Sequence, residues 1–146
     1  MSHNIMLYEK INQVIKEAYP ALESLQDDYF IIGSAALILS GVEVGHTSDI
    51  DILTSDRDAN YLKKVWKEKH VKEYQPKQND LFRSNFSRYN FEFLDVEIMG
   101  DLAVRKNNDW KPLIIQDYTY FSRDEIRIKL PTMEEQKRIL KWFGRD

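Results

Sequence analysis

Residues 48–53 constrain the fold most, because their side chains alternate between polar and apolar: Ser48-Asp49-Ile50-Asp51-Ile52-Leu53. Successive side chains of a β-strand point to opposite faces of its sheet, which predicts Asp49 and Asp51 together on one face. Two carboxylates on a strand with apolar flanks repel each other unless a cation neutralises them. The segment therefore predicts a central strand beside a divalent cation that binds oxygen ligands.

The spacing Asp-x-Asp carries little weight alone, because 13 Asp among 146 residues give about one such pair by chance. A second pair, Asp56 and Asp58, precedes a helical pattern with apolar residues at Tyr61, Leu62, Val65 and Trp66. We interpret this second pair as the start of a helix, where acidic side chains accept from free amides and face the positive end of the helix dipole.

A short β-favouring run, residues 29–32, comes before the acidic strand and is stopped by Gly33-Ser34. Residues 35–39 are apolar on every side and are closed by Gly41, which predicts a buried strand, a tight turn and a short buried helix. Free backbone amides and a hydroxyl at a helix start favour a phosphate group. Gly33 and Ser34 are therefore candidate phosphate ligands.

A second acidic strand is predicted for residues 91–98, where polar and apolar residues alternate again. Asp95 and Glu97 share one face of this strand, so either could be a third carboxylate beside the acidic pair. Their positions alone leave both alternatives open, together with that of a solvated strand acid.

The remaining elements follow from periodicity. A 3.6-residue period from Tyr8 predicts a first helix that ends near Pro20, and residues 70–90 show no clean period and are interpreted mostly as connection. Thr132 and Glu135 have the spacing of a capping box, which predicts a last helix through Phe143. Short β-like runs at residues 113–115, 118–121 and 126–128 predict a closing ribbon.

Composition limits the function classes. The length of 146 residues, with 42% hydrophobic content, predicts one domain over residues 1–146. The net charge of -3 gives no global basic field for nucleic acid, and the chain has no cysteine for disulfides or thiolate metal sites. The longest apolar stretch, residues 30–42, is too short for a bilayer, and the first residues show no secretory signal pattern, so we expect a cytoplasmic protein.

Three motifs taken together resemble a known superfamily: Gly33-Ser34, then the strand around Asp49 and Asp51, then Asp95 between Leu94 and Val96. This pattern is similar to that of the polymerase-β-like nucleotidyltransferases, and most similar to the small bacterial stand-alone members of the abortive-infection and antibiotic-modifying types. The resemblance extends from about residue 29 to residue 146. It implies an α/β (α+β) fold with a small mixed β-sheet backed by helices.

The same resemblance implies an enzyme that transfers a nucleoside monophosphate from an NTP such as ATP to an acceptor hydroxyl. Asp49, Asp51 and Asp95 would be catalytic and would hold Mg²⁺ or Mn²⁺, with Asp95 also the candidate general base. Glu97 is the alternative third acid, and Asp95 is preferred because its apolar neighbours match the family pattern. Gly33 and Ser34 would hold the β- and γ-phosphates.

The sequence departs from the family at the phosphate site, because Ala35 and Ala36 follow Ser34 where some members have a basic residue. A basic group must then come from elsewhere. The acceptor, whether a small molecule, an RNA end or a protein, would bind the 71–90 segment, a second copy of the chain or a partner protein. The candidates for the basic group are Arg83, Arg88, Arg105 and Lys129.

An alternative is a catalytically idle chain of this fold that binds a partner protein in the manner of an antitoxin. It is motivated by the small size of the chain and by the missing basic residue after Ser34. A third interpretation is the same fold without any metal. Metal-dependent nucleotide binding by the isolated chain would favour the enzyme over the other two interpretations.

Overall fold

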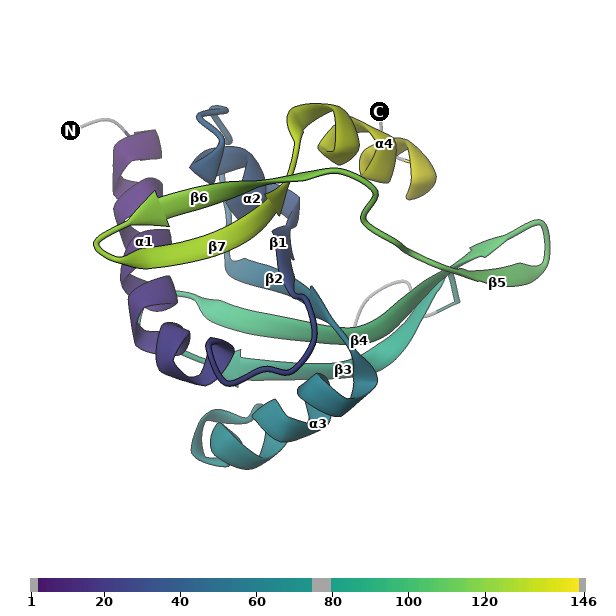
Figure 1. Ribbon diagram of the computed structural model, residues 1–146, viewed down its shortest axis with the longest axis horizontal. Coiled ribbons are helices and arrows are strands. Elements are labelled where there is room, and N and C mark those ends of the chain that lie inside the picture. Colours follow the sequence, from purple (N-terminus) through teal and green to yellow (C-terminus); the bar gives the residue numbers. More distant parts are fainter. Residues whose placement is uncertain (1–2, 75–79, 145–146) are drawn as a thin grey trace.

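The computed structural model describes residues 3–74 and 80–144. The chain forms a mixed sheet backed by helices, with a separate two-stranded ribbon after it (Figure 1). The elements, in chain order, are α1 (His3–Leu22), β1 (Phe30–Ile32), α2 (Gly33–Leu39), β2 (Asp49–Thr54), α3 (Asp56–Val65), a 3-10 turn (Lys67–Lys69), β3 (Phe82–Asn90), β4 (Asp95–Lys106), β5 (Asp109–Pro112), β6 (Tyr118–Arg123), β7 (Ile126–Pro131) and α4 (Met133–Trp142).

The main sheet has the strand order β1-β2-β4-β3, with β5 paired to β4. Strand β2 runs parallel to β4, whereas β1 pairs antiparallel with β2 and β3 pairs antiparallel with β4. The two central strands are therefore β2 and β4. The mixed α+β fold predicted from the sequence is confirmed.

The parallel register of β2 and β4 divides the sheet into two faces. Ile50 and Ile52 of β2 lie opposite Val96 and Ile98 of β4, and all four are at most 1% exposed. They pack with buried residues of α1, α2 and α3 in the main core. Because side chains alternate along each strand, the acidic side chains of both strands lie on the other face.

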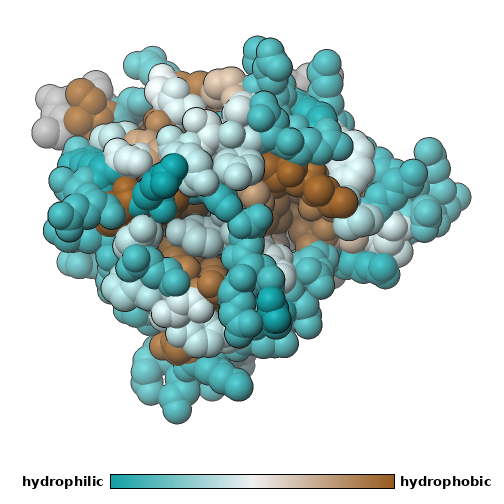
Figure 2. All heavy atoms as spheres, in the orientation of Figure 1, coloured by the Kyte–Doolittle hydropathy of each residue, from teal (hydrophilic) through white to brown (hydrophobic). Residues whose placement is uncertain are grey.

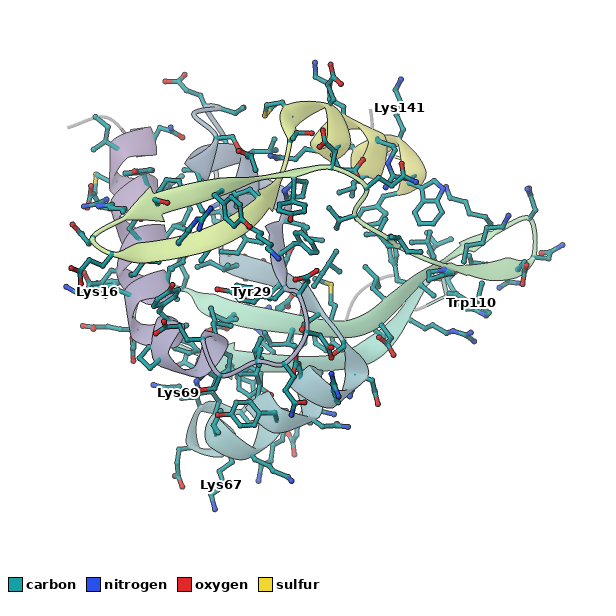
Figure 3. The ribbon with its side chains drawn as sticks, in the orientation of Figure 1. Lys16, Tyr29, Lys67, Lys69, Trp110 and Lys141 are labelled. Carbon is teal, nitrogen blue, oxygen red and sulfur yellow. The ribbon has the colours of Figure 1, made fainter. Side chains whose placement is uncertain are left out.

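Helices α3 and α4 lie on opposite sides of β3 and β4 (Figure 1). The β4–β5 hairpin projects from the body of the molecule, and Trp110, labelled in Figure 3, lies on this arm. Within the described residues, no helix combines the length and the apolar character needed to cross a membrane.

Two predicted boundaries around the second acidic strand were wrong. Residues 82–90, interpreted as connection, form β3, and residues 91–94 form the turn between β3 and β4 rather than the start of a strand. Pairing with β4 compensates for the polar composition of β3, since alternate residue pairs of an antiparallel ladder form backbone hydrogen bonds whatever their side chains. Residues 75–79 of the predicted connection lie outside the described residues.

Smaller differences also have local causes. Helix α1 continues through Pro20 to Leu22, whose side chain is 1% exposed in the main core. The N-cap of α3 is Ser55, which accepts from the amide of Asp58, instead of either aspartate. Residues 113–115 are not a strand.

The start of α4 has half of the predicted capping box. The hydroxyl of Thr132 accepts from the amide of Glu135, as predicted, but the carboxylate of Glu135 does not return to Thr132. It accepts instead from the amide of Gln116 and from the guanidinium of Arg138, whose Nε lies 2.5 Å from Oε1. Glu135 thus fastens the segment before β6 to the first turn of α4.

We predict that Glu135→Gln destabilises the fold at neutral pH. The side chain of Glu135 is 4% exposed, and the hydrogen bond from Arg138, helped by the amide of Gln116, holds the pKa of its carboxyl below the usual 4.5. Loss of a buried, charge-assisted partner costs about 1–3 kcal/mol. Because the pKa of Glu135 is lower in the folded than in the unfolded state, its ionised form stabilises the fold at pH values above the unfolded-state pKa. This stabilisation is lost as the pH falls through the folded-state pKa.

The measurement is the melting temperature of both proteins between pH 7 and pH 3. The melting temperature of Glu135→Gln should fall furthest below that of wild type at pH 7, and this difference should shrink below about pH 4.5. The exposed neighbour Glu134, changed to Gln, is the matched control and should show no such deficit. A deficit for Glu135→Gln that stays constant with pH would contradict the prediction.

Candidate active site

Three carboxylates gather on the face of β2 and β4 away from the main core. Asp49 and Asp51 of β2 and Glu97 of β4 each offer an oxygen, and these atoms lie within 4.8 Å of one another. The register explains the grouping, because Asp51 lies opposite Glu97 across the parallel pair. Asp95, preferred from the sequence, lies opposite Asp49 and is not part of this group.

Asp51 is the innermost of the three, and it lies against Gly33. A Cβ built on Gly33 would lie 2.9 Å from Asp51 Oδ2, closer than side chains approach. Gly33 also has a φ of +71°, which residues with a side chain rarely adopt. The turn between β1 and α2 therefore requires glycine both for its backbone conformation and for the space of the Asp51 carboxylate.

Burial and like charge act together on these acids. Burial raises the pKa of Asp51 well above its ordinary value, and the charges of Asp49 and Glu97 add to the effect. Burial, followed by the charge of Asp49, likewise raises the pKa of Glu97, although Arg88 partly opposes this. Asp51 Oδ1 is buried and accepts no hydrogen bond from any described residue. Such a group is expected where a cation or water completes the site.

Arg88 of β3 brings a positive charge into the group. Its Nη1 contacts Glu97 Oε2 and lies 3.4 Å from Asp49 Oδ2, and its Nε donates to Asp95 Oδ2 at 2.8 Å. Only 13% of the Arg88 side chain is exposed. Burial opposes its charge, but the hydrogen bond to Asp95 and the attraction of Glu97 outweigh burial and raise its pKa.

Both oxygens of Asp95 are used by neighbours on β3. Oδ1 accepts from Asn90 Nδ2 at 2.8 Å, and Oδ2 accepts from Arg88. Tyr74 completes the surroundings of Arg88, since the guanidinium lies 4.6 Å from the centre of its ring. The aspartate and the aromatic ring together hold the guanidinium of Arg88 beside the acids.

Ser34, predicted to bind phosphate, contributes to a chain of hydroxyls. Its Oγ lies 2.7 Å from Thr47 Oγ1, and Thr47 Oγ1 donates to the backbone oxygen of Asp49 at 3.1 Å. Because the single proton of Thr47 is used there, Ser34 is the donor to Thr47. This chain joins the start of α2 to the start of β2.

A cavity of about 760 Å³ opens beside the acidic group, within the range of 300–1,000 Å³ typical of small-molecule sites. Asp49, Asp51, Glu97 and Arg88 line its polar end, together with Gly33 and Ser48. In the same orientation as Figure 1, apolar residues gather between α4 and the β4–β5 arm (Figure 2). The apolar lining of the cavity consists of Ile32, Leu37, Phe82, Phe86, Met99, Leu102, Ile139, Leu140 and Phe143.

The predicted basic candidates differ in position. Arg88 reaches the carboxylates, and Arg83 lines the cavity with its guanidinium 4.7 Å from the ring of Trp110. Lys129 pairs with Asp28 at 2.6 Å, and Arg105 is exposed at the far end of β4. Arg88 was no more than one of four candidates in the sequence, because the pairing of β3 with β4 that places it there was not predicted.

No known sequence family matches the chain, and no curated protein sequence is significantly similar to it. Among solved structures, the chain is similar to a protein of Thermotoga maritima that is provisionally described as a nucleotidyltransferase. The two share 22% sequence identity, with a TM-score of 0.80 over 93% of this chain and 86% of that one. The chain therefore has the nucleotidyltransferase fold.

Proposed function

We propose that this chain, which has the nucleotidyltransferase fold, transfers a nucleoside monophosphate from an NTP to an acceptor hydroxyl. The observation that carries the proposal is the convergence of Asp49, Asp51 and Glu97 at the polar end of a ligand-sized cavity. The acceptor oxygen would form a bond to the α-phosphorus, the bond to the β-phosphate would break, and pyrophosphate would leave. A carboxylate would take the acceptor proton.

The residues fit a divalent metal ion. Three carboxylate oxygens converge, and Asp51 Oδ1 is a buried acceptor without a partner among the described residues. Carboxylates together with substrate phosphates are the ligands that Mg²⁺ prefers in proteins. When bound, a metal ion would neutralise the developing charge on the transferred phosphoryl group.

We propose Glu97 instead of Asp95 as the third acid. Glu97 lies across from Asp51 and lines the cavity, whereas both oxygens of Asp95 are engaged by Asn90 and Arg88. Burial and the charge of Asp49 raise the pKa of Glu97, which favours proton uptake by this group. Asp95 would then act through Arg88, whose Nε donates to it.

The partner-binding alternative has less support. The acid group is buried and its carboxylates repel one another, which destabilises the fold. Gly33 leaves space for the Asp51 carboxylate. A chain that only binds a partner would gain nothing from this arrangement. The cavity is also lined on one side by nine apolar residues, which suits a base or an apolar acceptor better than a flat protein surface.

Thermal unfolding with each NTP, with and without Mg²⁺ or Mn²⁺, tests the proposal. Ligand at about a hundred times its dissociation constant adds roughly 2.7 kcal/mol, which raises the melting temperature by several degrees. We expect a shift that needs metal and NTP together. Glu97→Gln should lose it, whereas Asp95→Asn should retain at least part of it.

A well-folded chain that shows no shift with any NTP would refute the proposal and favour the partner-binding alternative. A shift lost in Asp95→Asn and kept in Glu97→Gln would return the third-acid role to Asp95. Incubation with labelled NTP and candidate acceptors would then identify the product.

A further inference from the structure

We propose that Arg88 neutralises the acid group, Asp49, Asp51 and Glu97, while no metal ion or nucleotide is bound. Once both bind, its guanidinium moves to the phosphates of the nucleotide. The inference rests on the proposed function and deepens it. It begins from the position of Arg88 on β3, directly opposite Glu97 across the antiparallel pair with β4.

The guanidinium and a metal ion would bind the same carboxylates. Arg88 Nη1 contacts Glu97 and lies 3.4 Å from Asp49, and both acids belong to the group that converges within 4.8 Å. A carboxylate oxygen that accepts a hydrogen bond from a guanidinium is less available to a metal ion, so the two cations compete. A guanidinium does not lose its proton in a protein, so Arg88 can give way only by moving.

The surroundings of Arg88 allow such a movement while keeping it beside the cavity. Asp95 Oδ2 accepts from Nε at 2.8 Å, and the planar guanidinium can turn as a whole about this hydrogen bond, which moves both Nη atoms. The ring of Tyr74 supports one face of the guanidinium at 4.6 Å and stacks on Phe86 at 5.8 Å. Arg88 lines the same cavity as the acids, so a short turn would direct its Nη atoms toward a phosphate.

The candidate phosphate site lacks a basic residue, because Ala35 and Ala36 follow Ser34. In this proposal, Arg88 supplies the missing positive charge. The planar fork of arginine matches phosphate oxygens as well as carboxylates. Among the described residues that line the cavity, the other arginine is Arg83, which stacks on Trp110 and forms no ion pair with the acid group. It provides a matched control.

The test compares wild type, Arg88→Gln, Arg88→Lys and Arg83→Gln by calorimetric titration with two probes. The first probe is Mn²⁺ alone, and the second is inorganic triphosphate with saturating Mg²⁺. Arg88→Gln should bind Mn²⁺ at least about tenfold more tightly, because a competing charge is gone, and triphosphate at least about tenfold more weakly. Arg83→Gln should change Mn²⁺ affinity by less than about threefold.

Arg88→Lys keeps the positive charge but loses the planar guanidinium that binds two oxygens at once. This variant also allows the test if Arg88→Gln does not fold. It should fall between wild type and Arg88→Gln with both probes. Unchanged or weaker Mn²⁺ binding in folded Arg88 variants, or unchanged triphosphate binding, would overturn the exchange. If wild type binds neither probe, the proposed function fails as well, so the two failures are distinguishable.

Discussion

Asp51→Asn should lower nucleotide transfer by at least about a thousandfold, which corresponds to about 4 kcal/mol of transition-state stabilisation. Asparagine keeps the size of the side chain but removes the charge that would hold a cation. The fold should not suffer, because burial beside Asp49 and Glu97 makes a charged Asp51 unfavourable, as its raised pKa shows. We expect an unchanged or higher melting temperature without ligand, together with loss of the metal-dependent nucleotide shift.

Asp58→Asn is the matched control, because Asp58 belongs to the second Asp-x-Asp pair and is also buried, at 2% exposure. Its two oxygens accept from the amides of Gln26 at 3.0 Å and Asp27 at 2.7 Å. Asparagine leaves one of these amides without an acceptor, at a cost of about 1–3 kcal/mol.

Asp58→Asn should therefore lower the melting temperature while transfer below that temperature stays close to wild type. The two variants thus have opposite effects on stability and activity. If Asp51→Asn retained transfer within tenfold of wild type, or if it behaved as Asp58→Asn does, the acid group would have no place in the chemistry.

The contrast between these two pairs shows what a sequence can reveal. Strand periodicity alone places Asp49 and Asp51 on one face, and the structure has them on one face of β2. The sequence pattern places Asp58 at the start of a helix, and it does lie in the first turn of α3. Its carboxylate, however, accepts from the amides of Gln26 and Asp27 in the segment before β1. Local patterns identify the elements, whereas contacts between distant segments decide what a side chain does.

The third acid illustrates the same limit. Asp95 and Glu97 share a face of β4, and the register with β2 decides that Asp95 lies opposite Asp49 and Glu97 opposite Asp51. A register is a property of two strands far apart in the sequence, so no motif within residues 91–98 could give it. The position of Arg88 depends in the same way on β3, whose polar composition concealed it.

Gly33→Ala should damage the site in a way that the backbone conformation alone does not explain. The φ of +71° costs an alanine about 1–2 kcal/mol, and the new Cβ would also lie 2.9 Å from Asp51 Oδ2. The carboxylate belongs to a central strand and must turn away, because the strand that carries it is paired on both sides. We expect metal-dependent nucleotide binding at least about tenfold weaker, besides a lower melting temperature.

Gly41→Ala separates these two effects at the other end of the same helix. Gly41 has a φ of +91°, and nothing lies within 4 Å of the Cβ that alanine would add there. Both variants should lose stability because of the positive φ, measured by denaturant unfolding, and Gly33→Ala should lose more because of its contact with Asp51. Gly41→Ala should bind metal and nucleotide as wild type does. Equal binding in the two variants would mean that the space beside Asp51 is not what Gly33 provides. Weakened binding in Gly33→Ala alone would establish that the glycine before Ser34 acts on the acid group through close contact.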